Sequence, residues 1–91
     1  MVRTPLTDEQ RHRGRILGQV LREARGRRSA AQVSVESGVP LDTLRKIERG
    51  AIAMPAFFTV AQLARVLDLD LAELAAELFA ADAPEAPAGA A

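Results

Sequence analysis

The 91-residue sequence contains no cysteine, tryptophan or tyrosine, and it has only three phenylalanines and one histidine. Without cysteine, neither a disulfide nor a thiolate-bound metal can hold the fold, so stability must come from packed apolar faces or from a partner subunit. Absent cysteines also fit a reducing compartment. No apolar run approaches the ~20 residues that span a bilayer, and the polar N-terminus does not resemble a signal peptide. We therefore expect one small cytoplasmic domain with no membrane contact.

Side-chain groupings that support catalysis or metal binding are also missing. His12 has no cysteine or acidic cluster at metal-ligand spacing, so we expect it on the surface. Ser29, Ser34 and Ser37 have no nearby base, and the glycines form no phosphate-binding loop motif. The sequence therefore predicts no catalytic residue, no metal, no cofactor and no small-molecule ligand. We do not expect an enzyme.

The charges are balanced in number but not in position. Residues 1–50 carry a net charge of +5, whereas residues 51–91 carry −5 and contain Arg65 as their single cation. Such asymmetry suggests a basic working face and an acidic opposite end. The alternative is an ordinary solvated surface on which charge is unevenly spread.

Helical periodicity dominates the chain, and strand signals are weak. The pattern predicts an all-α fold whose five helices cover residues 8–25, 30–37, 41–49, 57–67 and 71–80. Residues 8–80 then form the domain and residues 1–7 a loose segment. Residues 81–91, rich in alanine and proline, form a disordered tail.

Cap residues mark several of the helix ends. Thr7 and Gln10 match a capping box at the start of the first helix, and Ser29 is a good N-cap for the second. Gly38 is expected to end the second helix in the left-handed conformation. Pro40 presets the start of the third helix, because proline costs little at a helix N-terminus.

Apolar residues at helical spacing predict the core. The expected set is Ile16, Leu17, Val20, Leu21, Ala24, Val33, Val39, Leu44, Ile47, Val60, Leu63, Ala64, Leu67, Leu71, Leu74 and Leu78. Of Phe57 and Phe58, one is expected to pack inward and the other to meet a partner subunit. Gly14 and Gly18 weaken the prediction of helix in the first half of segment 8–25.

The segment 29–50 carries most of the functional information. It contains two short predicted helices hinged on Gly38, and the second helix bears Arg45, Lys46 and Arg49 within two turns. This pattern is typical of a helix-turn-helix, whose second helix enters the major groove of DNA.

Two linked blocks make the pattern more specific. They are GVPLDTLRKIERG at 38–50, with a glycine turn and an Ile-Glu-x-Gly motif, and PAFFTVAQLARVLDLDLAEL at 55–74, a proline-led helix with Leu, Ala and Leu at fixed spacing. With them, residues 17–78 resemble the lambda-repressor-like (XRE) family of bacterial and phage regulators. The resemblance implies a compact five-helix bundle that binds double-stranded DNA as a homodimer. Ala30 departs from the family, since many relatives carry glutamine there.

The resemblance also implies which side chains read bases. The groove-facing positions are Leu41, Asp42, Arg45 and Lys46, of which Arg45 or Lys46 would bond guanine O6 and N7. Asp42 would accept from a cytosine amine, or would instead interact with the positive N-terminal end of its helix. Leu41 would touch a thymine methyl or serve as a packing residue.

Phosphate contacts are expected on either side of the turn. Arg49 lies at the end of the third helix, where relatives contact phosphate. Arg27, Arg28 and Ser29 flank the start of the second helix, whose free backbone N–H groups suit a phosphate. The alternative for Arg27 and Arg28 is a solvated turn.

A structural ion pair is also implied by the resemblance. Glu48 belongs to the Ile-Glu-x-Gly motif, and relatives pair this glutamate with an arginine of the first helix, which Arg25 matches here. We expect a partly buried pair that ties the first helix to the third, and its disruption would strand one charge.

These expectations converge on a small bacterial transcriptional regulator, by default a repressor that blocks polymerase. As a homodimer it would place helix 41–49 of each subunit in successive major grooves of a roughly palindromic operator. The rival hypothesis is a protein-interaction module on the same fold, such as an antitoxin or a partner-binding adaptor. The zero net charge and Leu41 in a groove position keep this rival open.

Overall fold

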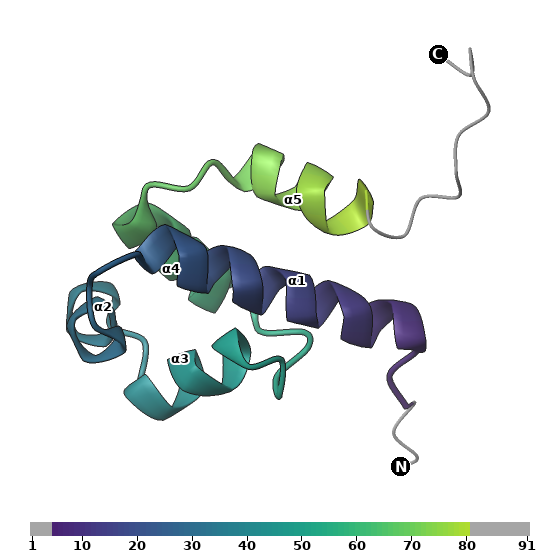
Figure 1. Ribbon diagram of the computed structural model, residues 1–91, viewed down its shortest axis with the longest axis horizontal. Coiled ribbons are helices and arrows are strands. Elements are labelled where there is room, and N and C mark those ends of the chain that lie inside the picture. The colour runs from purple at the N-terminus through teal and green to yellow at the C-terminus, as the bar shows by residue number, and fades with distance from the viewer. Residues whose placement is uncertain (1–4, 81–91) are drawn as a thin grey trace.

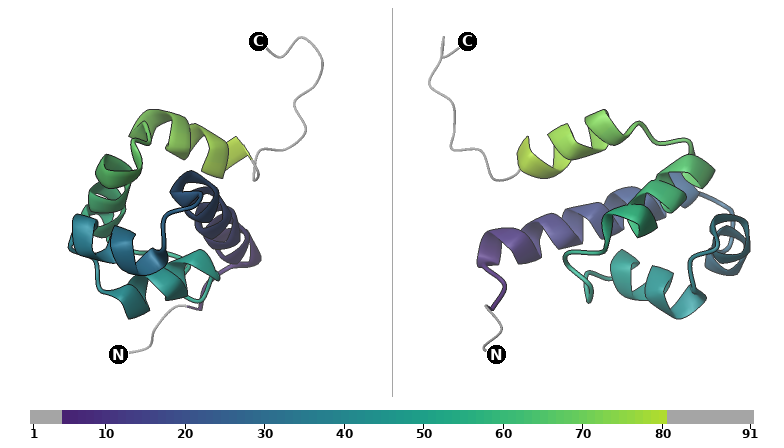
Figure 2. Two further views of the ribbon diagram at one scale, coloured as in Figure 1. Left: turned by 60° about the vertical axis from the view of Figure 1, so that its left-hand side comes forward. Right: turned by 180° about the vertical axis from the view of Figure 1, so that it is seen from behind.

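The computed structural model describes residues 5–80, which form five helices and no strand, so the predicted all-α fold class is confirmed. In Figure 1, α1 crosses the middle of the molecule, with α5 on one side of it and α3 on the other. The views in Figure 2 show the same order, and α2 contacts α3 and α4. The helices are α1 (Asp8–Arg25), α2 (Ala30–Ser37), α3 (Leu41–Glu48), α4 (Phe57–Leu67) and α5 (Leu71–Ala80).

Within residues 5–80, none of the helices is both long and apolar enough to cross a membrane. The predicted tail at 81–91 and the first four residues of the predicted loose segment 1–7 lie outside the described residues. Pro5 and Leu6 are exposed and precede the first helix.

The helix starts follow the predicted caps. Thr7 Oγ1 accepts from the Gln10 backbone N–H at 3.0 Å, and the Thr7 N–H donates to Gln10 Oε1 at 2.8 Å, which completes the capping box of α1. Ser29 Oγ accepts from the Gln32 N–H at 3.0 Å at the start of α2. Gly38 ends α2 with φ 78° and ψ 4°, in the left-handed region that favours glycine.

The third helix ends one residue earlier than predicted. It spans Leu41–Glu48, and Arg49 is its C-cap with φ −94° and ψ 6°. The Arg49 N–H still donates to the Arg45 carbonyl at 3.1 Å, but the backbone then turns into Gly50 at φ 80°. The left-handed glycine therefore decides where α3 stops.

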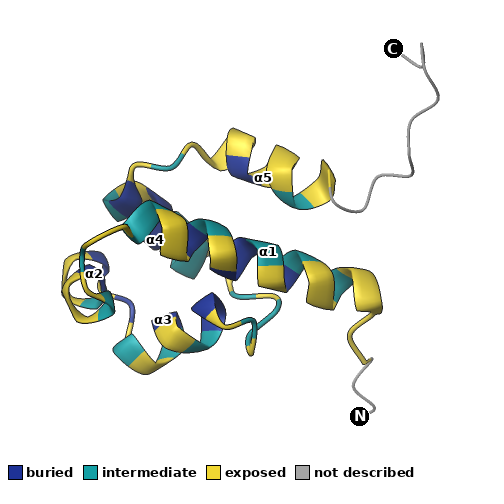
Figure 3. Ribbon diagram, viewed as in Figure 1, coloured by how far each residue is buried: buried dark blue, intermediate teal, exposed yellow. Residues whose placement is uncertain are grey.

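The core lies where α1, α3 and α4 face one another, with α2 and α5 closing its sides (Figure 3). Each fully buried leucine contributes about 2 kcal/mol relative to exposure. In the described part of the chain, the buried apolar side chains all belong to the predicted set: Leu17, Leu21, Val33, Val39, Leu44, Ile47, Leu63, Ala64, Leu67 and Leu74. The half-buried members lie at the margin: Ile16, Val20, Ala24, Val60 and Leu78.

The predicted inward packing of one of Phe57 and Phe58 is wrong, and Leu71 of the predicted core set is exposed. Phe57 and Phe58 are 65% and 77% exposed, so neither packs inward, and their rings meet edge to face with centroids 5.4 Å apart. Phe57 shares a helical face with Val60 but lies in the first turn of α4, at the edge of the core. Leu71 is 40% exposed for the same reason, because it lies in the first turn of α5, before the buried Leu74.

Gly14 and Gly18 have a role that the sequence pattern did not indicate. Both are buried in an unbroken α1. A Cβ on Gly18 would lie 2.4 Å from the Glu48 carbonyl oxygen, and a Cβ on Gly14 would lie 2.6 Å from Ala53 Cα. The two glycines, one turn apart, therefore allow the end of α3 and the loop after it to lie directly against α1.

Candidate nucleic-acid interface

The turn between α2 and α3 is fixed by apolar burial and by two serine side chains. Val39 is only 2% exposed, which places it as the plug between the two helices. Its N–H donates to Ser37 Oγ at 3.2 Å, and its carbonyl accepts from the Ser34 hydroxyl. The sequence indicated only that these two serines are small packing residues. Their hydrogen bonds to Val39 also help to fix the angle between α2 and α3.

One side of α3 is buried and the other is open to solvent. Leu44 and Ile47 are fully buried, and Glu48 is 8% exposed. The opposite side presents exposed Arg45 and half-buried Lys46, and α3 itself lies at the lower edge of the molecule in Figure 3. The side of α3 that faces away from the body is therefore polar and cationic, as groove entry requires.

Two of the predicted base-reading side chains contact each other. Lys46 Nζ lies 3.0 Å from Asp42 Oδ2, one helical turn away; the Asp42 side chain is 77% exposed and that of Lys46 43%. A pair of this kind contributes less than about 0.5 kcal/mol, so a base edge can compete with it. Arg45 makes no ion pair within residues 5–80. Leu41 is half-buried, which leaves both of its predicted roles open.

The cations before α2 differ in their contacts. Arg27 is exposed beside Ser29, which caps α2. The Arg28 guanidinium donates to the Val66 carbonyl at 3.3 Å and lies 3.6 Å from Glu36 Oε1, so it connects α2 with α4. Arg28 would have to leave these contacts to reach a phosphate, whereas Arg27 would not.

The structure brings Arg25 and Glu48 together as a two-point ion pair between α1 and α3. Arg25 Nε donates to Glu48 Oε2 at 2.9 Å, and its terminal nitrogen donates to Oε1 at 3.0 Å. A further bond from Arg25 to the Arg28 carbonyl at 2.9 Å fixes the guanidinium. Because the side chains are only 19% and 8% exposed, we regard this as a partly buried pair rather than a surface one.

The guanidinium of Arg25 keeps its positive charge at every pH short of strong alkali. The hydrogen bond to Glu48 raises the pKa of Arg25, burial opposes that effect, and Coulomb attraction to Glu48 adds to it. A raised folded-state pKa stabilises the fold below the pKa of the unfolded chain, and this stabilisation disappears only as pH rises through the folded value. For an arginine that change is confined to strong alkali.

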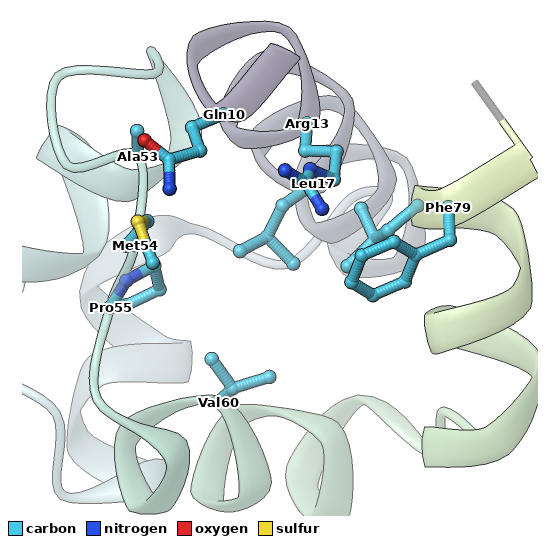
Figure 4. Close-up of a pocket in the computed structure, with 9 residues that line it drawn as sticks. Gln10, Arg13, Leu17, Ala53, Met54, Pro55, Val60 and Phe79 are labelled. Atoms are coloured by element: carbon cyan, nitrogen blue, oxygen red, sulfur yellow. The ribbon is translucent and has the colours of Figure 1, made fainter. Parts of the chain in front are cut away.

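A hollow of apolar character lies between α1, the loop after α3, α4 and α5 (Figure 4). It has a volume of about 320 Å³. At the edge of this hollow, the Arg13 guanidinium lies 4.7 Å from the centre of the Phe79 ring, within cation–π range. The sequence did not predict this hollow, because it forms only where the loop after α3 meets α1 and α5. Its lining is Gln10, Arg13, Leu17, Ala53, Met54, Pro55, Val60, Leu78 and Phe79.

A comparison with known protein families bears directly on this geometry. A family model described as a helix-turn-helix domain matches residues 16–78, from the middle of α1 to near the end of α5. The chain belongs to this helix-turn-helix family. No curated protein matches the chain. In this helix-turn-helix domain, α2, the Gly38 turn and α3 are the elements that give the family its name, and membership supports DNA binding.

Proposed function

We propose that this helix-turn-helix domain is a bacterial, cytoplasmic transcriptional regulator of the lambda-repressor-like (XRE) type. It binds double-stranded DNA sequence-specifically by inserting α3 into the major groove, and it represses by blocking polymerase. It is not an enzyme and needs no cofactor. The observation that carries the proposal is the outward, cationic side of α3, whose opposite side is buried against the rest of the domain.

The contacts that hold α3 against the rest of the domain matter because the helix has only eight residues. A helix this short is not stable alone in water, so its shape depends on tertiary contacts. Burial of Leu44 and Ile47 and the Arg25–Glu48 pair supply those contacts. A helix that is already ordered loses less conformational entropy when it enters a groove, which favours affinity.

Homodimerisation is part of the proposal. One α3 reads one half-site, and a second copy related by two-fold symmetry would read the other, about 34 Å along the duplex. The surface that supports self-association lies on the side of α4 and α5, where Met54, Phe57, Phe58 and Phe79 are 62%, 65%, 77% and 57% exposed. Phe57 and Phe58 contact each other, and Met54 and Phe79 line the same hollow. Adjoining exposed apolar side chains are typical of an interaction surface.

The roles of individual side chains can be separated by affinity measurements. An operator is first selected from a random oligonucleotide pool, and fluorescence anisotropy then compares it with random duplex. Lys46→Ala should lower the preference for operator by about 1–3 kcal/mol, because it removes a base contact, whereas Arg49→Ala should weaken binding to both duplexes alike. Equal effects of the two variants would contradict these assignments.

The exposed apolar side chains on α4 and α5 also favour the rival function, a protein-interaction module such as an antitoxin or a partner-binding adaptor. The same titration distinguishes the two functions. A steep loss of affinity with rising salt supports DNA binding, since displaced counterions must return to the duplex. Absence of binding to any duplex at about 50 mM salt favours the interaction module.

A further inference from the structure

Three arginines for which the sequence pattern indicates no common role converge beside the end of α3. Arg15 and Arg22 lie on one face of α1 with Gln19 between them, and Arg49 is the C-cap of α3. Together with Glu48 they line an open hollow of about 340 Å³. We call this feature the arginine cleft; it lies between α1 and α3, apart from the apolar hollow of Figure 4.

Two glycines build the cleft. Gly18 allows the last carbonyl groups of α3 to lie against α1, since a Cβ there would be 2.5 Å or less from two of them. Gly50 allows the Arg15 side chain to pass over the turn, since a Cβ there would lie 3.1 Å from Arg15 Cγ. Arg15 and Arg22 are therefore held beside the end of α3.

The cleft has an unbalanced positive charge. Glu48 is the single carboxylate in its lining, and that carboxylate is already bonded at both oxygens by Arg25. Within residues 5–80, Arg15, Arg22 and Arg49 make no ion pair. The partial negative charge at the C-terminal end of α3 offsets only part of their mutual repulsion. A bound anion would offset the rest.

We propose that the arginine cleft binds phosphate groups of the DNA backbone, on a strand that borders the groove occupied by α3. This inference rests on the proposed function. Guanidinium groups bind phosphate through two parallel hydrogen bonds, which makes arginine the suitable cation for this ligand. Arg49 connects the cleft to the exposed side of α3, where Arg45 lies one turn away.

The length of the cleft fits this ligand. Arg15 and Arg22 are seven residues apart, which corresponds to about 10 Å along α1. Successive phosphates of one strand advance by about 3.4 Å along the duplex axis, so the two side chains span about three base pairs. Arg15 and Arg22 therefore extend the DNA footprint by two phosphate contacts beyond those of α3.

The test is the salt dependence of DNA binding by the full chain carrying Arg15→Gln and Arg22→Gln together. The matched control is Arg65→Gln, an exposed arginine on α4 with no ion pair within residues 5–80. Anisotropy with operator and random duplex measures the slope of log affinity against log salt concentration. Relative to the wild-type chain, the magnitude of this slope should fall by about 0.9 in each single variant and by about 1.8 in the double variant. At about 100 mM salt, each arginine replaced should weaken binding to both duplexes to the same degree, on the order of tenfold. The control should match the wild-type chain.

The outcomes separate this inference from the proposed function. If the wild-type chain binds DNA and the double variant keeps its slope, the cleft does not bind the DNA backbone, while the proposed function stands. A wild-type chain that binds no duplex overturns both. Inorganic phosphate provides a further arm, followed through the arginine Nε–H signals by NMR: saturable phosphate binding with an unchanged DNA slope would mean that the cleft serves a free anion. Unchanged thermal melts of the variants establish that they fold.

Discussion

The region formed by α1, α2 and α3 presents cations to solvent, whereas the region formed by α4 and α5 presents apolar side chains and carboxylates. Residues 1–50 hold a net charge of +5 and residues 51–91 a net charge of −5. Within residues 5–80, five of the seven large exposed hydrophobic residues, among them Phe57, Phe58 and Phe79, lie after residue 50. The first surface suits a polyanion and the second suits another protein surface. A chain that is neutral in total can therefore still carry a surface suited to DNA.

The helices of the two regions are also held in place by different kinds of contact. Directional contacts join α1, α2 and α3: the close approach at Gly18, the Arg25–Glu48 pair and the serine bonds at Val39. The contacts of α4 and α5 with the body are mainly apolar, through buried residues such as Leu63 and Leu74. Small substitutions at the contacts of α3 should thus lower the stability of the fold more than substitutions on the exposed side of α4 and α5.

The largest expected effect is that of Gly18→Ala. Alanine favours helix over glycine by about 1 kcal/mol, which by itself would stabilise α1. The added Cβ, however, would lie 2.4 Å and 2.5 Å from the carbonyl oxygens of Glu48 and Ile47, and backbone atoms cannot rotate away. We expect a net loss of about 3 kcal/mol in the free energy of unfolding, measured by urea denaturation. Gln19→Ala, at an exposed neighbouring position, is the control, and a gain in stability for Gly18→Ala would contradict the close contact.

The next effect in size is that of Glu48→Ala. It leaves the Arg25 guanidinium partly buried without its carboxylate, and we expect a loss of about 2–3 kcal/mol. The control is Asp42→Ala, which breaks the exposed pair with Lys46 and should cost about 0.5 kcal/mol or less. Thermal melts followed by circular dichroism compare the two. Equal melting temperatures would mean that the Arg25–Glu48 pair does not hold α3.

The smallest expected effect on stability is that of Phe58→Ser. Because this ring is 77% exposed, its removal should change the free energy of unfolding by less than about 0.5 kcal/mol. If α4 and α5 form the subunit contact, the same substitution should weaken the dimer. Analytical ultracentrifugation of the variant beside the wild-type chain measures this, with Arg65→Ser as an exposed control on α4. A large loss of monomer stability would show that Phe58 supports the fold.

Much of this fold follows from short-range patterns. The ends of α1 and α2 depend on caps such as Thr7 and Ser29, and the turn depends on Gly38, each acting over three or four residues. The core follows from apolar spacing within each helix. The exposure of Phe57 could not be predicted from spacing, because Phe57 lies on the core-facing side of α4. It is exposed because it lies in the first turn of the helix, at the edge of the core.

The sequence by itself determined the five helices, the glycine turn and the identity of the polar side of α3, because capping and periodicity act within one segment. The Arg25–Glu48 pair came from family resemblance, since nothing local joins residues 23 positions apart. Only the tertiary structure decided that Gly18 brings α3 onto α1 and that Arg15, Arg22 and Arg49 share one hollow. Such convergence depends on how closely two helices approach, and that distance is set by packing between segments about 30 residues apart.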